Sequence, residues 1–476
     1  MASKKLAPQV YKFGGASLAD GAAYRHAARI SRQCPAPLAV VCSAPAGVTD
    51  LLLEVAERAR SGEGKKTEPA LLAVRERFRV ILQQLALPAK AKADLIKIVD
   101  VSMAELNSLA MGLSALRELT ARTSDLVVSR GERLSAHLFC AALRSAGGKS
   151  EYVDAMDVVH TDGPYGGAGP NLAKTDAGVR ACLRPLMAKK IVPVVPGFLG
   201  AWNRSHAHES ALVTLGRGGS DLTATLLGRA LDASQVTLWK DVPGLLTADP
   251  RVVPDAKVIP QLHVREAAEL AYYGATVLHS RALIPVQGRD IPVFVRPFAD
   301  PAAPGTEICN RRNLALPPVK ALSAVAGQAL ITVAGRGLLG VPGVAARTFA
   351  TLSAYDISIS LITQASSEQS ICFTVPEKQA KLARDRLEES FHDELARRDV
   401  DGILVQSHLT TVAVVGLGMA GAPGIAAQAF AALATSDINV IAIAQGSSEL
   451  NISIVVPSSQ SALALKKIHE AFRLGD

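Results

Sequence analysis

The first 300 residues alternate short apolar runs with longer amphipathic stretches. The apolar runs predict strands at Val10–Phe13, Leu38–Cys42, Ile191–Val195 and Gln235–Trp239. Helical spacing of apolar positions predicts helices at 20–31, 49–61, 68–86, 90–120, 133–146 and 220–231. Strands that alternate with helices are typical of a sheet covered on both faces, so we expect an α/β/α sandwich.

The last third of the chain is an internal repeat. Residues 333–375 and 414–456 align without a gap. The identities include Gly337/Gly418, Gly343/Gly424, Phe349/Phe430, Asp356/Asp437 and Gln364/Gln445. Each copy predicts a strand, a glycine-rich turn, a helix, two strands and a closing helix. Helices are expected at 344–354 and 378–392, then at 425–435 and 458–473, with an extra strand before each copy at 319–325 and 402–406. The tail is therefore predicted to be two small α+β domains.

A stretch rich in proline turns at 299–318 is a plausible hinge. We expect a first domain over 1–300, a linker over 301–318, and two repeat domains over 319–398 and 399–476.

The composition argues against several classes of protein. Hydrophobic residues make up 49% of the 476 and charged residues 20%, which excludes wholesale disorder. The net charge of +8 is scattered along the sequence, so we expect no nucleic-acid partner and favour a cleft for small anions. The six cysteines form no C-x-x-C pair, so free thiols in a reducing cytoplasm are expected. The start carries no export signal, and the long uncharged run 409–436 contains four glycines and a proline, so no membrane span is expected.

Both repeats contain a G-x-G-x-x-G pattern, at 335–340 and 416–421, with Asp356 and Asp437 about 20 residues on. This pattern allows a dinucleotide-binding interpretation. We do not favour it, because another glycine, Gly343 or Gly424, stands directly before each helix, which therefore starts too late for the fingerprint.

Three segments combine glycines with charged residues. Lys12, Gly14 and Gly15 lie between a strand and a helix, where backbone N–H groups and an ammonium can hold phosphate, although a Gly-Gly turn can be purely structural. Arg217 can grip a carboxylate, and Asp221 can hold Mg²⁺, position Lys12 or cap its helix. Glu132 can bind an ammonium group or simply favour the first turn of a helix.

Two further loops follow predicted strands. Residues 43–50 form a loop of mostly small residues. Residues 241–251 contain two acids and an arginine, which suits a nucleotide or a plain hairpin. The motifs read, in order, KFGGAS, SAPAGVTD, SRGERLSA, PGFLG, LGRGGSDLTAT, WKDVPGLLTADPR and YGATVLHS, and then the two repeats. This order resembles the aspartate kinases of the amino-acid kinase superfamily over essentially the whole chain. The repeats resemble ACT domains, most closely those in the threonine-sensitive kinase half of bifunctional aspartokinase–homoserine dehydrogenases.

The resemblance implies a feedback-regulated enzyme that phosphorylates the side-chain carboxylate of L-aspartate with ATP and Mg²⁺. By this resemblance, Lys12 and Asp221 are catalytic, and the substrate is bound by Ser43, Thr49, Glu132 and Arg217. ATP is bound by Lys12, Gly14, Gly15, Lys240, Asp241, Leu246 and Arg251. An amino-acid effector, threonine or lysine or both, is bound by Gln364, Gln445 and Asn439. The resemblance also implies a homodimer or larger homo-oligomer paired through its ACT domains, in the cytoplasm that the free thiols indicate.

Four residues depart from the family pattern: Ala16 and Lys240 replace threonines, Thr276 replaces a lysine and Ser280 replaces a proline. The lysine missing at 276 removes a phosphate contact that Lys240 could restore from another direction. The departures keep open an amino-acid sensor with an inactive kinase domain. A kinase acting on another carboxylate, such as glutamate, also stays open. The sequence leaves the inhibiting amino acid undecided. A Gln at the end of a strand can also have a purely structural role, in which its side chain hydrogen-bonds the backbone at that strand end.

Overall fold

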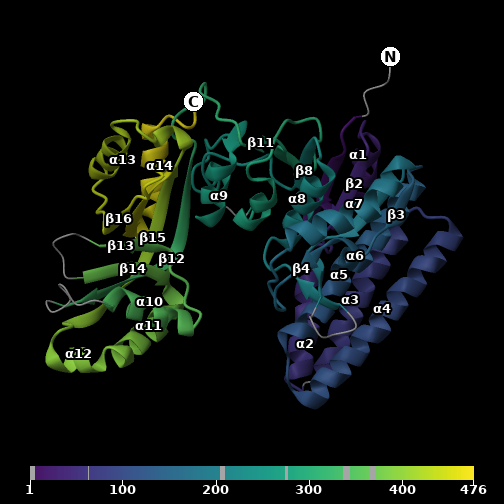
Figure 1. The fold of residues 1–476 in the computed structure, drawn as a ribbon, viewed down its shortest axis with the longest axis horizontal. Coiled ribbons are helices and arrows are strands. Elements are labelled where there is room, and N and C mark those ends of the chain that lie inside the picture. The colour runs from purple at the N-terminus through teal and green to yellow at the C-terminus, as the bar shows by residue number, and fades with distance from the viewer. Residues whose placement is uncertain (1–5, 63, 204–209, 274–276, 336–342, 365–369) are drawn as a thin grey trace. The chain divides into compact units, whose positions relative to one another are not determined.

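The computed structural model describes residues 6–62, 64–203, 210–273, 277–335, 343–364 and 370–476. The chain forms two compact units (Figure 1). The first unit comprises Met1–Leu245, Pro260–Val264 and Val277–Arg311, and the second comprises Leu246–Ile259, Arg265–Thr276 and Arg312–Asp476. Two short segments that precede residue 300 therefore pack with the repeats.

The first unit is built on an eight-stranded sheet in the order β3-β5-β2-β1-β8-β10-β11-β9. Its neighbouring strands are parallel except for the antiparallel pair β10–β11. The strands are β1 (Gln9–Phe13), β2 (Leu38–Cys42), β3 (Ser150–Tyr152), β5 (Val192–Pro196), β8 (Gln235–Lys240), β9 (Gln261–His263), β10 (Val293–Pro297) and β11 (Thr306–Cys309). A smaller sheet joins β4 (His160–Thr161), β6 (Leu199–Trp202) and β7 (Ala211–Thr214).

Helices pack against this sheet. They are α1 (Gly21–Arg32), α2 (Val48–Arg60), α3 (Gly64–Gln84), α4 (Ala89–Leu116), α5 (Ala121–Ser145), α6 (Ala155–Val158), α7 (Leu172–Ala188) and α8 (Gly219–Leu231), with 3₁₀ turns η1 (Ala16–Leu18) and η2 (Ser280–Val286). The long helices α3 and α4 run side by side (Figure 1). Tyr11 and Phe13 of β1 join the core that contains Tyr24 of α1 and Phe139 of α5. Because side chains alternate along a strand, Lys12 points to the opposite face, toward α8.

The predicted helix over 90–120 ends earlier, and the next begins earlier than predicted. Helix α4 stops at Leu116 because Arg117 adopts a left-handed conformation, with φ of 54°. Thr120 then caps α5 by accepting a hydrogen bond from the Thr123 amide at 3.2 Å. Glu132 therefore lies in the middle of a helix that starts at Ala121. The interpretation of Glu132 as a first-turn residue favoured by the helix dipole is wrong.

The second unit contains a six-stranded sheet in the order β13-β14-β12-β15-β17-β16. The strands are β12 (Ala321–Ala334), β13 (Leu361–Thr363), β14 (Ser370–Pro376), β15 (Gly402–Val415), β16 (Ala442–Ala444) and β17 (Asn451–Pro457). The helices are α9 (Val264–Tyr272), α10 (Val344–Ala354), α11 (Glu377–Ser390), α12 (His392–Arg397), α13 (Ile425–Ala434) and α14 (Ser461–Ala471), with η4 (Leu417–Met419) and η5 (Ser458–Gln460).

The two central strands differ from the prediction. Each combines the extra strand predicted before a repeat with the first strand predicted within that repeat. Strand β12 covers 321–325 of the first and 328–333 of the second, and β15 covers 402–406 and 410–415. The strands pair with each other along their whole length, with register shifts between Val325 and Leu330. The two repeats therefore share one continuous sheet.

The glycine pattern at 416–421 does not open a helix. The turn η4 follows Gly416, and α13 begins only after Gly424, which caps it with φ of 90°. Most of the matching pattern in the first repeat, including Gly337 and Gly340, lies outside the described residues. All six cysteines are free thiols. Within the described ranges, no helix combines the length and hydropathy needed to cross a membrane.

Candidate active site

The carboxyl ends of three neighbouring strands carry the predicted phosphate-binding groups. Lys12 lies near the end of β1 and pairs in register with Val41 of β2 and Leu238 of β8. Ser43 directly follows β2, and Lys240 is the last residue of β8. In open α/β sheets, ligands bind at this edge, where the strand order reverses. The sheet order, with β2 on one side of β1 and β8 on the other, places that reversal at β1.

Asp221 lies between two lysines at this edge. Its Oδ1 is 2.7 Å from Lys12 Nζ, and its Oδ2 accepts a hydrogen bond from Lys240 Nζ at 2.8 Å. Lys12 and Asp221 are 5% and 4% exposed. The contact between Lys12 and Asp221 that the sequence analysis suggested is thus present, and Lys240 completes the group.

The pKa values of this cluster follow from burial and mutual charge. Burial would raise the pKa of Asp221, but the two ammonium groups outweigh it and lower that pKa to about 2. Burial lowers the pKa of Lys12 to about 8, and the nearby Lys240 adds to this, while Asp221 opposes it. One carboxylate with two ammonium groups leaves the cluster with an excess positive charge, which suits a polyphosphate.

Glu132 lies close to the same cluster, on α5. It is 5% exposed, and its Oε2 has no hydrogen-bond partner among the described residues. Burial raises the pKa of the Glu132 carboxyl to about 8, although backbone hydrogen bonds, one from Ala44, and the charge of Lys12 act against the rise. A buried acceptor without a partner is costly, so this oxygen is well suited to a ligand cation.

Arg217 lies in the loop that leads into α8. Gly218 caps that helix with φ of 75°, and an added Cβ would lie 2.4 Å from His279 Cβ, so only glycine fits there. Arg217 is exposed, and its charge and that of Asp221 both act on His279. No role for His279 follows from the sequence, because nothing local to residue 279 indicates a contact with the loop that contains Arg217 and Gly218.

The remaining predicted residues of this edge are half-buried or exposed. Gly14 lies beside Lys12, since an added Cβ would be 3.4 Å from its Nζ. The Gly15 carbonyl accepts a hydrogen bond from the Ala46 amide at 3.1 Å, which joins the Gly15 turn to the loop after β2. Ser43 and Thr49 flank that loop and are half-buried, and Asp241 follows β8 and is exposed.

Leu246 and Arg251 belong to the second unit. The Arg251 side chain is 87% exposed and is paired with Asp249. Their contact with a nucleotide stays a prediction. Thr276 lies outside the described residues.

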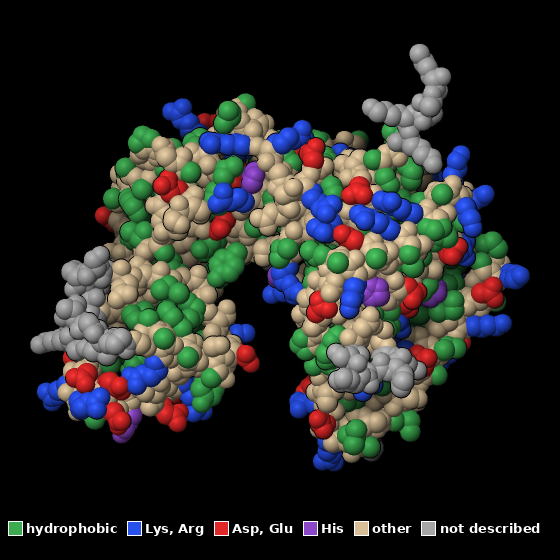
Figure 2. All heavy atoms as spheres, in the orientation of Figure 1, with side chains coloured by type: hydrophobic (Ala, Val, Ile, Leu, Met, Phe, Trp, Pro, Cys, Tyr) green, Lys and Arg blue, Asp and Glu red, His purple; other side chains and the backbone are tan. Residues whose placement is uncertain are grey.

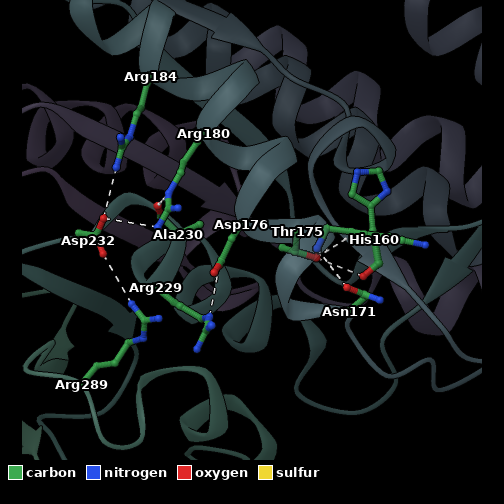
Figure 3. Close-up of polar contacts among 11 residues, drawn as sticks. His160, Asn171, Thr175, Asp176, Arg180, Arg184, Arg229, Ala230, Asp232 and Arg289 are labelled. Atoms are coloured by element: carbon green, nitrogen blue, oxygen red, sulfur yellow. Dashed lines mark hydrogen bonds and ion pairs between the residues drawn. The ribbon is translucent and has the colours of Figure 1, made fainter.

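A cluster of arginines gathers at the other end of α8 (Figure 3). Arg180, Arg184 and Arg289 surround Asp232, at 3.3–3.6 Å, and Arg229 pairs with Asp176 at 3.3 Å. Asp232 caps the carboxyl end of α8, where positive charge is favourable. On the face shown in Figure 2, basic and acidic side chains are interspersed. The arginine cluster is thus explained by helix capping, separately from the site at Asp221.

The second repeat contains a cavity of about 440 Å³ at the predicted effector residue Gln445. Its lining comprises Met419, Ala422, Gly424, Ile425, Ala426, Gln445, Gly446, Ser447 and Glu449. Asn439 is exposed and is not among these residues. In the first repeat, Gln364 is exposed at the end of β13, and residues 365–369 lie outside the described part of the chain.

Comparison with known proteins places this chain in a family. The amino acid kinase family model matches residues 8–297, and an ACT domain model matches residues 331–391 and 412–472. Lysine-sensitive aspartokinase 3 of Escherichia coli is 34% identical over 462 residues, which cover 97% of this chain and 98% of that protein. This chain belongs to the aspartokinase family.

Solved aspartokinase structures agree with this assignment. The crystal structure of E. coli aspartokinase III in complex with aspartate and ADP has a TM-score of 0.81 and 32% identity, over 97% of this chain and 99% of that one. The bifunctional aspartokinase/homoserine dehydrogenase of Haemophilus influenzae is 35% identical over 468 residues, which are 56% of that protein. This chain spans about half the length of the bifunctional relatives it matches. The expected amino-acid kinase fold followed by ACT domains is confirmed.

Proposed function

We propose that this chain is a feedback-regulated aspartate kinase. The main observation in its favour is the cluster of Lys12, Asp221 and Lys240, which lies beside Glu132 at the carboxyl ends of the parallel strands. A side-chain carboxylate oxygen of L-aspartate attacks the γ-phosphorus of ATP, and a new O–P bond forms. The bond from that phosphorus to the β,γ-bridging oxygen breaks, which gives 4-phospho-L-aspartate and ADP.

The proposed roles divide between the two substrates. Arg217 binds the α-carboxylate of aspartate and Glu132 binds its α-ammonium, while Ser43 and Thr49 line the pocket. Lys12 and the amides of Gly14 and Gly15 hold the β- and γ-phosphates, and Asp241, Leu246 and Arg251 meet the rest of the nucleotide. Two anions must be brought together in this reaction, so positive charge at the transferring phosphoryl group supplies most of the catalysis.

The ammonium of Lys240 supplies the positive charge that a lysine at position 276 supplies in the family pattern. This ammonium lies 2.8 Å from Asp221 Oδ2, while Lys12 contacts Oδ1 of the same carboxylate. Both lysines can then face the same phosphates. This supports activity in spite of the departures at Ala16 and Thr276.

Mg²⁺ is proposed to arrive with ATP. Among the described residues, no group of three or more His, Cys, Asp or Glu side chains could hold a metal ion. The carboxylate of Asp221 already contacts two lysines, so it does not fit a metal ligand. Phosphate and water oxygens are therefore left as the ligands of the ion.

Feedback is proposed to act through the repeats. One solved E. coli aspartokinase III structure is a complex with lysine and aspartate in the T-state, with a TM-score of 0.77 and 33% identity. In this chain the cavity at Gln445, and Gln364 in the first repeat, would bind lysine, threonine or both. Ile362 and Ile443, on the edge strands β13 and β16, are 51% and 41% exposed. These exposed apolar side chains support pairing of the ACT domains in a homo-oligomer. The free thiols suit the cytoplasm.

Hydroxylamine trapping of the acyl phosphate tests this proposal. Incubation with ATP, Mg²⁺ and aspartate should give aspartyl hydroxamate, and addition of lysine or threonine should reduce its rate. Glutamate in place of aspartate should give none. Hydroxamate from glutamate alone would indicate a different acceptor, and amino-acid binding without any hydroxamate would indicate a sensor with an inactive kinase domain.

A further inference from the structure

The segment that leads into Arg217 is held by a buried carboxylate on α5. Asp125 is 2% exposed, and its Oδ2 accepts hydrogen bonds from the backbone amides of Thr214 and Gly166, both at 2.9 Å. Its Oδ1 accepts a third, from the Thr214 hydroxyl, at 2.7 Å. Thr214 is the last residue of β7 and stands three residues before Arg217.

Arg281 holds the same segment from another direction. Its Nη1 donates to the Leu215 carbonyl at 3.0 Å, and its Nη2 donates to the Ala168 carbonyl at 3.2 Å. The Ala168 amide in turn donates to the Thr214 carbonyl at 2.9 Å. Asp125 and Arg281 therefore join the end of β7 to the glycine-rich loop 162–170.

That loop is itself anchored at its base. The Asn171 amide donates to the His160 carbonyl at 2.8 Å, and the Thr175 hydroxyl donates to the same carbonyl at 3.1 Å (Figure 3). An added Cβ at Gly216 would lie 3.2 Å from Gly167 Cα. The residue directly before Arg217 thus rests on a fixed loop.

We propose that Asp125 is a positioning residue that fixes Arg217 relative to Glu132. Asp125 and Glu132 are seven residues apart on one helix, which is two turns and about 10 Å. One rigid helix thus carries the proposed partner of the substrate ammonium and the carboxylate that anchors the Arg217 loop. This inference rests on the substrate roles proposed for Glu132 and Arg217.

The separation between Arg217 and Glu132 matters because of the geometry of aspartate. Its α-ammonium and α-carboxylate are attached to the same carbon, so their two partners must keep a fixed separation. A displacement of about 1 Å in such a pair can cost about 100-fold in rate. The contacts that Asp125 and Arg281 make with this segment, called here the clamp, also fix how far the side-chain carboxylate of the substrate reaches toward the phosphate. This distance allows the site to discriminate aspartate from the longer glutamate.

The test compares Asp125→Ala with Asp125→Asn. Alanine removes all three contacts. Asparagine can keep them, because its oxygen can accept from the two amides while the Thr214 hydroxyl turns to accept from its NH₂ group. We expect Asp125→Ala to raise the aspartate KM at least tenfold and to narrow the preference for aspartate over glutamate in kcat/KM. The ATP KM should change less than threefold, and Asp125→Asn should restore most of the aspartate KM.

The matched control is Asp176→Asn, which breaks the ion pair with Arg229 between α7 and α8 (Figure 3). This variant should leave the aspartate KM unchanged. An unchanged aspartate KM in folded Asp125→Ala would overturn the proposal. A fall in kcat accompanied by equal rises in the aspartate KM and the ATP KM would also overturn it. If Asp125→Ala does not fold, Arg281→Gln removes the opposite side of the clamp and is judged by the same criteria.

Failure of this inference can be told apart from failure of the proposed function. Arg217→Met and Glu132→Gln test the substrate contacts directly. If these two variants raise the aspartate KM and Asp125→Ala does not, the clamp alone is wrong. If Arg217→Met and Glu132→Gln leave the aspartate KM unchanged, the proposed substrate site is wrong.

Discussion

The affinity for aspartate should depend on the ionisation of Glu132. Its carboxyl has a pKa of about 8 without substrate, raised from 4.5 by burial. At about 1.4 kcal/mol per pH unit, this shift corresponds to about 5 kcal/mol against the charged form. The substrate ammonium requires that charged form, so binding must expel a proton at neutral pH. About one molecule in ten is ionised at pH 7.

The apparent aspartate KM should therefore fall as pH rises toward 8. We expect a decrease of about tenfold per unit below pH 8 and a plateau above it, until the amino group of aspartate loses its own proton. The assay is ADP release at saturating ATP, with aspartate titrated at pH 6.0, 7.0 and 8.0. Glu132→Gln should show a high aspartate KM that does not vary with pH over this range. An aspartate KM that is constant in the wild type from pH 6 to 8 would refute the reasoning.

The other predictions concern the phosphate cluster and the effector cavity. The ATP KM should rise above pH 8, because Lys12, with its pKa lowered to about 8, loses its charge there; a flat ATP KM from pH 7.5 to 9.5 would contradict this. Lys240→Ala should raise the ATP KM at least tenfold with the aspartate KM nearly unchanged, and an unaltered ATP KM would exclude its compensating role. Asp221→Asn should abolish activity and destabilise the fold by about 3 kcal/mol in urea unfolding, since it leaves the buried ammonium of Lys12 and the half-buried ammonium of Lys240 without a carboxylate. A variant as stable as the wild type would contradict that estimate. Gln445→Ala should raise the half-inhibitory effector concentration at least fivefold without changing uninhibited kcat, and unaltered inhibition would place the effector elsewhere.

Periodicity predicted the elements that form one continuous apolar or amphipathic run. The strands β1, β2 and β8 and the helices α10 and α13 lie within about one residue of their predicted bounds. Local pattern also predicted which glycine loops follow strands. The local pattern alone did not group Lys12, Ser43 and Lys240; the resemblance to aspartate kinases implied that they share a site.

The misses have two physical causes. The break between α4 and α5 depends on a left-handed Arg117 and a threonine cap, which apolar spacing does not reveal. The fusion of two predicted strands into β12 depends on pairing with β15, about 80 residues away.

The network behind the site was missed for the second reason. Asp125 is 89 residues from its partner Thr214, and Arg281 is 66 residues from Leu215. Each looks like an ordinary surface charge in sequence. Only the tertiary fold brings them to the loop that carries Arg217.

The most direct test of the substrate site is a crystal structure of this chain with ADP and aspartate. We predict the aspartate α-carboxylate on the Arg217 guanidinium, its ammonium on Glu132, and the terminal phosphate of the nucleotide at Lys12. Aspartate bound away from both Arg217 and Glu132, or a nucleotide whose phosphates lie away from Lys12, would contradict the account.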